Sequence, residues 1–310
     1  MSDLPQATLG RTGVSVTKLG YGAMELRGGG AAFRPGHQLD DADIDRLLNG
    51  VLDAGINLID TSPDYGDSEE HIGRFLAGRR DEYFLASKCG CAVGEAAKGP
   101  GIGEHTFTRE NVRAGVEQSL RRLRTDHVDL VQFHASPTRS VLEEHDAVAE
   151  LEALRDEGKI RFLGMSGTLP NLPDHIAMGV FDAFQIPYSA VEREHEQAIS
   201  DAAAAGAGTI IRGGVARGLP EPPANLPDQY KAYGEAMVAR KERFATTDIT
   251  DLLDGGTPME FMLRFTISHP DLHTTIVGTS NIDHLAANIA AASKGPLPPD
   301  VYEAARARFA

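Results

Sequence analysis

"HVDLVQFHASPTRSVLEEHDAVAELEALRDEGKIRFLGMSG", residues 127–167, contains the pattern that decides the fold. It begins with an apolar run at 127–134, continues with helically spaced apolar residues at 141–158, and ends with a second apolar run at 159–167. The first and last runs predict strands, and the middle one predicts a helix that Gly158 ends. Two strands joined through a helix are typical of a parallel sheet.

The same alternation extends over most of the chain. Residues 8–24 predict three short β runs. The first two lie on either side of a turn at Thr12-Gly13 and are expected to form an N-terminal β-hairpin. The other strands are expected at 56–60, 82–88, 127–134, 159–167, 181–188, 208–214 and 273–280. Helices are expected at 40–55, 68–78, 108–124, 141–158, 172–179, 194–206, 257–270, 281–295 and 298–310.

From Gly20 onward this makes eight strands, each followed by a helix, and predicts one (β/α)₈ TIM barrel domain over residues 1–310. An open doubly wound sheet is the alternative, and it fits less well because no "GxGxxG" turn opens the first unit. Ser68 is expected to open its helix and Gly78 to end it, and Thr108 is a candidate N-cap. The stretches 90–107 and 213–230 read as long loops on the active face that act as substrate lids.

Composition limits the classes of partner. Hydrophobic residues make up 41% of the chain and charged residues 24%, which is ordinary for a globular protein with a sizeable core. A net charge of −15 argues against a nucleic-acid partner or an anionic membrane surface. The N-terminus does not read as a signal peptide, and no run of 18 apolar residues predicts a membrane span.

The two cysteines, Cys89 and Cys91, are separated by one residue, which is too close for an unstrained disulfide. We expect reduced thiols in a cytoplasmic protein, and the two residues read as incidental small side chains. Two thiolates alone do not make a zinc site.

Chemistry in such a barrel lies at the carboxyl ends of the strands. Asp60, Lys88 and His134 end apolar runs on three neighbouring predicted strands, and Tyr65 lies in the loop that follows Asp60. Further polar residues at strand ends are Ser166, Gln185 and Arg212. A lysine ammonium beside a phenol lowers the pKa of the phenol, and an aspartate keeps that ammonium charged. The phenol can then protonate a developing alkoxide while a histidine donates a hydrogen bond to the same oxygen, which is a site for reducing a carbonyl by hydride.

At this point the sequence resembles the aldo-keto reductase family. The resemblance covers roughly residues 8–293 and is carried by "LGRTGVSVTKLGYGAM", "GINLIDTSPDYGDSEEHIG", "FLASKCG", "SLRRLRTDHVDLVQFH", "GKIRFLGMSG", "FQIPYS" and "TTIVGTSNIDHLAANIAA". It implies a (β/α)₈ barrel, no metal, and a nicotinamide cofactor that lies extended across the barrel mouth. The family's catalytic tetrad falls on Asp60, Tyr65, Lys88 and His134, all of the expected types.

The resemblance also implies cofactor contacts. Ser166 and Gln185 fall where the family binds the carboxamide, and Gly22, Ala23 and Met24 lie where the first loop approaches the cofactor. The pyrophosphate and adenosine segment falls on Gly278, Thr279, Ser280, His284 and Asn288.

Three positions depart from the family pattern. Gly167 stands where an asparagine usually follows the serine, so one amide contact is lost or replaced. Arg212 stands where an aromatic residue often stacks on the nicotinamide; its guanidinium can stack too, or reach the pyrophosphate or an acidic substrate. His284 replaces a basic residue that grips the 2′-phosphate, which weakens the expectation of NADP over NAD without removing it.

The sequence therefore predicts an NAD(P)H-dependent reductase of a small aldehyde or ketone, acting reversibly, with NADP favoured. The substrate is set by the loops at 25–38, 89–107 and 213–235. One alternative is a non-catalytic regulatory or sensor protein that binds a nicotinamide on the same barrel. A weaker one is a metal-dependent hydrolase built on Asp60, Asp64 and His71, since no histidine pair has metal-ligand spacing on a strand.

Overall fold

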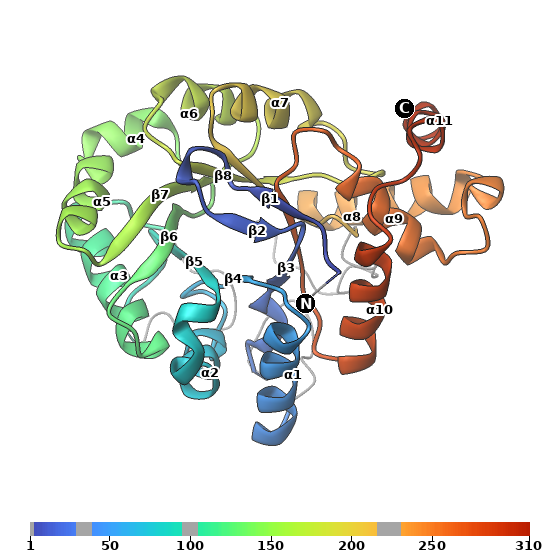
Figure 1. Ribbon diagram of the computed structural model, residues 1–310. Helices are drawn as coiled ribbons and strands as arrows, with labels where there is room; N and C mark the ends of the chain where they lie inside the picture. The colour runs from blue at the N-terminus through green and yellow to red at the C-terminus, as the bar shows by residue number, and fades with distance from the viewer. Residues whose placement is uncertain (1–2, 29–38, 95–104, 216–230) are drawn as a thin grey trace.

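A computed structural model describes residues 3–28, 39–94, 105–215 and 231–310, and it is built on a closed barrel of eight parallel strands (Figure 1). Neighbouring strands follow the order β10-β3-β4-β5-β6-β7-β8-β9, so each strand pairs with the next one along the chain and β10 closes on β3. The strands are β3 (Leu19–Gly22), β4 (Leu58–Asp60), β5 (Phe84–Cys89), β6 (Val128–Phe133), β7 (Ile160–Ser166), β8 (Ala183–Pro187), β9 (Gly208–Arg212) and β10 (Thr274–Val277). The predicted TIM barrel is confirmed.

Helices surround the barrel (Figure 1). They are α1 (Asp41–Asp53), α2 (Ser68–Phe75), α3 (Arg109–Leu123), α4 (Arg139–Glu144), α5 (Ala147–Asp156), α6 (Leu172–Met178), α7 (Glu196–Ala204), α8 (Lys231–Thr246), α9 (Pro258–Ile267), α10 (Ile282–Ser293) and α11 (Pro299–Arg308). Several begin where the sequence offers a capping side chain, because a side-chain oxygen satisfies a backbone N–H of the first turn. Asp40, Thr108, Thr257 and Asn281 each accept such a bond.

The predicted helix at 141–158 is wrong as a single element. The chain forms α4 and α5 on either side of a break at Asp146, whose φ of 49° is left-handed. Aspartate is one of the few residues that enter this region readily, and no periodicity of apolar residues reveals it.

Two other helical expectations need correction. α2 ends at Phe75, and Gly78 lies inside the short 3₁₀ segment η3 (Ala77–Glu82) instead of ending the helix. α8 was not predicted at all; it packs against the C-terminal end of the chain, where Phe244 stacks on Phe309 with ring centroids 6.2 Å apart. Of the loops expected to act as lids, residues 95–104 and 216–230 lie outside the described residues.

The predicted N-terminal hairpin is confirmed and closes one end of the barrel. Its strands are β1 (Gln6–Thr8) and β2 (Ser15–Thr17), which lie in front of the barrel in Figure 1. Leu9 and Val16 are fully buried in a small cluster with Leu58, Phe84 and Ile210 from the barrel strands. Because the hairpin fills the amino ends of the strands, their carboxyl ends form the other mouth, where TIM barrels carry their chemistry.

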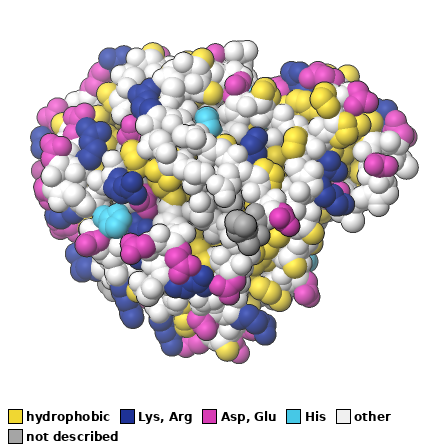
Figure 2. Space-filling view, viewed as in Figure 1, with side chains coloured by type: hydrophobic (Ala, Val, Ile, Leu, Met, Phe, Trp, Pro, Cys, Tyr) yellow, Lys and Arg dark blue, Asp and Glu magenta, His cyan; other side chains and the backbone are white. Residues whose placement is uncertain are grey.

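Acidic and basic side chains are interspersed over the hairpin face of the molecule (Figure 2). No field of a single sign covers this face. Within the described ranges, no helix combines the length and the apolar character needed to cross a membrane.

Candidate functional site

A buried ion pair lies at the carboxyl ends of β4 and β5. Lys88 Nζ donates to Asp60 Oδ1 at 2.7 Å and to the backbone oxygen of Thr61 at 2.8 Å. Both side chains are almost completely buried, with exposures of 0% and 2%. Burial works against the ammonium, but Asp60 beside it raises the pKa of Lys88 above its ordinary value. The lysine is therefore charged at neutral pH.

The second carboxylate oxygen of Asp60 is held by two amides. Gln132 Nε2 donates to Asp60 Oδ2 at 3.0 Å, and Gln185 Nε2 donates to it at 2.8 Å. Gln132 was missed in the sequence, although a polar residue inside the apolar run of β6 is a signal that could have drawn attention to it. It pairs in register with Lys88, so both side chains leave the sheet on the same side.

Tyr65 is brought over this ion pair by the tight turn after β4. Its backbone N–H donates to the oxygen of Ser62 at 3.0 Å. The next residue, Gly66, has a φ of 50°, and a Cβ there would overlap the carbonyl oxygen of Arg27, so only glycine fits. Lys88 Nζ lies 5.1 Å from the centroid of the Tyr65 ring. The turn thus places the phenol and the ammonium side by side.

His134 follows β6 and completes the group. Its backbone N–H donates to the oxygen of Cys89 at 3.1 Å, and its ring meets the ring of Tyr65 edge-on, with centroids 6.2 Å apart. Burial lowers the pKa of His134 to about 4, although the carboxylate of Asp64 beside it acts in the opposite direction. The imidazole is neutral at neutral pH. The structure therefore brings together all four residues of the predicted tetrad.

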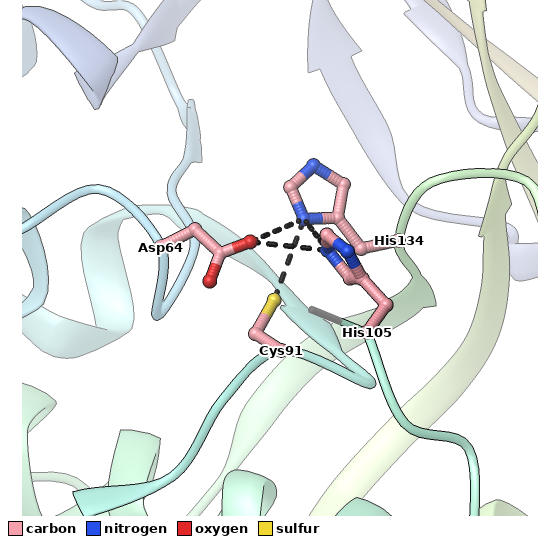
Figure 3. A group of neighbouring side chains, drawn as sticks. All are labelled: Asp64, Cys91, His105 and His134. Atoms are coloured by element: carbon pink, nitrogen blue, oxygen red, sulfur yellow. Dashed lines mark hydrogen bonds and ion pairs between the residues drawn. The ribbon is translucent and has the colours of Figure 1, made fainter. Parts of the chain in front are cut away.

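On the side of Nδ1, His134 belongs to a second group that the sequence did not predict (Figure 3). Its Nδ1 lies 3.2 Å from Asp64 Oδ2, 3.2 Å from His105 Nε2 and 3.4 Å from Cys91 Sγ. Burial raises the pKa of the Asp64 carboxyl group. The two imidazoles beside it have the larger, opposite effect and hold that pKa well below its usual value. Burial raises the pKa of the Cys91 thiol. The group joins the loop after β4, the end of β5, the segment before α3 and the end of β6.

The residues of the predicted metal hydrolase do not come together as that alternative requires. Asp60 forms an ion pair with Lys88. His71 lies on α2, where its ring stacks on Phe75. Only Asp64 of the three belongs to a group of potential metal ligands in the described parts of the chain.

The predicted cofactor residues occupy the rest of the barrel mouth. Ser166 ends β7, Gln185 lies in β8, and Arg212 ends β9. Gly22 ends β3, and Ala23 and Met24 begin the 3₁₀ segment η2 (Ala23–Leu26). Gly278, Thr279 and Ser280 directly follow β10, and His284 and Asn288 lie one turn apart on α10. These strands are neighbours in the barrel, so the set forms one continuous arc beside the tetrad.

The carboxamide of a nicotinamide fits Ser166 and Gln185. Gln185 Nε2 donates one hydrogen to Asp60, and Gln185 Oε1 accepts a long bond of 3.4 Å from Ser166 Oγ. Both side chains are buried, at 5% and 1% exposure. Exchanging that long bond for a carboxamide would let Gln185 Oε1 accept from the amide N–H₂ and the Ser166 hydroxyl donate to the amide oxygen, so the pair is the complement of a carboxamide.

Gly167, where the family pattern has an asparagine, has little room for a side chain. A Cβ at this position would lie 2.8 Å from Leu172 Cδ1 and 3.3 Å from Met165 Cγ. Its backbone N–H donates to the oxygen of Gln185 at 3.0 Å. In this structure Leu172 of α6 therefore packs into the space that a side chain at position 167 would need.

We predict that Gly167→Asn lowers the free energy of unfolding by about 1–3 kcal/mol, because the added side chain overpacks this contact. The measurement is the urea midpoint at unchanged m-value. Gly78→Asn is the matched control, since a Cβ at Gly78 meets nothing within 4 Å. Equal midpoints for the two variants would contradict the packing argument.

Comparison with known proteins places this arrangement in a family. The model of the Aldo/keto reductase family matches residues 18–307. The chain belongs to the aldo/keto reductase family. The solved structure of aldo-keto reductase AKR11C1 from Bacillus halodurans in its holo form has a TM-score of 0.79 and 26% identity, over 99% of this chain and 96% of that one.

Two curated relatives of this aldo/keto reductase have stated activities. L-galactose dehydrogenase of Arabidopsis thaliana is 27% identical over 95% of this chain and 90% of its own length. The NADH-specific methylglyoxal reductase of Escherichia coli is 31% identical over 61% of this chain and 60% of its own length. Family membership supports an oxidoreductase of carbonyl compounds that uses a nicotinamide cofactor; it does not distinguish NADP from NAD, and the Escherichia coli relative is NADH-specific.

Proposed function

We propose that this aldo/keto reductase reduces an aldehyde or ketone to the alcohol with NAD(P)H, with Tyr65 as the general acid. The observation that carries the proposal is the buried Lys88–Asp60 ion pair beside the Tyr65 ring, with His134 edge-on to the same ring. Desolvated charges with perturbed pKa values are concentrated at functional sites, and this pair lies at the carboxyl ends of the strands, where TIM barrels carry their chemistry.

Lys88 and Asp60 act on Tyr65 and do not themselves exchange protons with the substrate. The phenol becomes a phenolate when it protonates the carbonyl oxygen, and the Lys88 ammonium 5.1 Å from the ring centre stabilises that negative charge. Asp60, fixed by Gln132 and Gln185, keeps the lysine charged through the reaction. Since the same site stabilises the shared transition state, oxidation of the alcohol is also catalysed.

His134 orients and polarises the carbonyl. Its neutral imidazole donates a hydrogen bond from Nε2 to the substrate oxygen, opposite the cluster that surrounds Nδ1. Ser166 and Gln185 hold the carboxamide of the nicotinamide, which supplies the hydride when it is bound. The glycines and hydroxyls after β10, with Arg212, hold the remainder of the cofactor.

The test is to follow oxidation of NADPH and NADH by the purified protein against a panel of aldehydes and ketones, alongside a titration of each nucleotide. We expect carbonyl-dependent oxidation with saturation in both substrates. Tight nicotinamide binding without turnover on the whole panel would instead favour the sensor alternative.

We further propose that NADPH is preferred over NADH and that His284 limits this preference. His284 is exposed on the first turn of α10, where it can face an adenosine 2′-phosphate. We predict that His284→Lys tightens NADPH binding by about 10- to 100-fold and leaves NADH unchanged, because a charge-assisted bond to phosphate contributes about 1.5–3 kcal/mol. The measurement is Kd for both nucleotides.

Ala286→Lys is the matched control, because it adds the same charge to an exposed position on roughly the opposite side of α10. Equal gains in NADPH affinity from both variants would show a general effect of charge and contradict the role of His284.

A further inference from the structure

We propose that Asp64, Cys91, His105 and His134 bind a Zn²⁺ ion. Their four potential ligand atoms all lie within 4.8 Å of one another. Asp64 Oδ2 lies 3.1 Å from His105 Nε2 and 3.2 Å from His134 Nδ1, and the two nitrogens are 3.2 Å apart. Cys91 Sγ lies 3.4 Å from His134 Nδ1. The group comes from four separate segments, as Figure 3 shows, and it meets at one point beside the tetrad.

These separations are close to those of a tetrahedral zinc site. Zinc–ligand bonds of about 2.0–2.3 Å in a tetrahedron place neighbouring ligand atoms roughly 3.3–3.8 Å apart. The distances of 3.1 and 3.2 Å among Asp64, His105 and His134 lie just below that range, and the 3.4 Å between Cys91 and His134 lies inside it, so a small outward adjustment admits the ion. Two imidazole nitrogens, one thiolate and one carboxylate are ligands that zinc accepts.

The hydrogen bonds within the group, between His105 Nε2 and His134 Nδ1 at 3.2 Å and between Cys91 Sγ and His134 Nδ1 at 3.4 Å, leave one buried acceptor unsatisfied. Asp64 Oδ2 is buried, and among the described residues no donor makes a hydrogen bond of good geometry to it. If both imidazoles directed their N–H groups at Asp64, the contact between the two nitrogens would contain no hydrogen and would be repulsive. Lone pairs that converge on a cation remove both difficulties.

The site would be closed, because four protein ligands leave no position for water or substrate. The ion would therefore act on chemistry only through His134. A metal on Nδ1 fixes the ring proton on Nε2, and Nε2 points away from the cluster in Figure 3. That is the tautomer able to donate to a carbonyl oxygen. This consequence, unlike the binding itself, rests on the function proposed above. Asp64, Cys91 and His105 are positioning residues on this account.

The binding test uses the full chain, stripped of metal and kept reduced, and is run in the Tyr65→Phe background so that it does not depend on turnover. Zn²⁺ affinity is measured by competition with a chromophoric chelator, and Co²⁺ is the absorbing probe. We expect a stoichiometric site with a sulfur-to-cobalt charge-transfer band. Because changes in outer-shell partners already cost about 10–100-fold, Cys91→Ala and His105→Ala should each weaken Zn²⁺ binding by at least about 100-fold.

Two matched controls are available. Cys89→Ala removes the other buried thiol, which belongs to the hydrophobic core, and His127→Ala removes a histidine that pairs with Asp126 at the surface. Both should bind Zn²⁺ as the parent does. Equal affinities in all four variants, or a cobalt complex without the sulfur band, would overturn the proposal.

The role of His134 has its own readout. In the protein labelled with ¹⁵N at histidine, the shifts of the His134 ring nitrogens should report Nε2–H when Zn²⁺ is bound. His105→Gln, which retains a polar side chain, should lose this signature at the same Zn²⁺ concentration. Zinc binding with His134 still protonated at Nδ1 would remove His134 from the ligands and overturn the four-ligand site.

Discussion

Tyr65→Phe is expected to lower kcat for carbonyl reduction by about 10²- to 10⁴-fold, the usual contribution of a positioned general acid. The ring is retained, so its edge-on contact with His134 and its place beside Lys88 persist. Only the proton donor is lost. Because Ser166, Gln185 and the segment after β10 hold the cofactor in our proposal, nicotinamide Kd should change little. The measurements are steady-state NAD(P)H oxidation and a nucleotide titration of the same preparation.

Tyr83→Phe is the matched control for the loss of a phenol hydroxyl. Tyr83 is buried, precedes β5 at the opposite end of the barrel, and lies under the guanidinium of Arg80. It should retain the parent kcat. An active Tyr65→Phe enzyme would require another proton donor and would refute the proposed mechanism.

The barrel and the tetrad could be predicted because both follow from local pattern plus one topological rule. Each apolar run ends in glycine or in a polar residue, and parallel strands place all their carboxyl ends at one mouth. Asp60, Lys88 and His134 were therefore expected to converge before any distance was known. Thr108 marked a helix start for the same local reason, because a capping oxygen acts within one turn.

The rest depends on contacts between distant segments. The break at Asp146 depends on a left-handed residue, and α8 gains its stability from packing such as that of Phe244 on Phe309. The four members of the proposed zinc site have no common spacing, and they come from loops and strand ends between 64 and 134. Cys91 read as an incidental small residue because a single chain position carries no information about what folds against it.

Removing one partner of the buried Lys88–Asp60 pair should have the largest effect on stability. Lys88→Met leaves the Asp60 carboxylate buried with only the two amides of Gln132 and Gln185. Breaking such a pair typically costs about 3–5 kcal/mol of unfolding free energy, because an uncompensated charge remains inside. Asp60→Asn should cost a similar amount, since its neutral amide oxygen can still accept from Lys88 Nζ but no longer compensates the buried ammonium.

The double variant Lys88→Met with Asp60→Asn removes both charges and should be less destabilised than the sum of the two single changes by more than about 1 kcal/mol. Urea unfolding of all four proteins gives this coupling energy. The exposed pair of Arg46 and Asp43, with side chains 66% and 42% exposed, is the matched control, and Arg46→Met should cost less than about 1 kcal/mol. Additive losses at Lys88 and Asp60 would mean that the two charges do not stabilise each other. In that case Asp60 could not be what keeps Lys88 charged beside Tyr65.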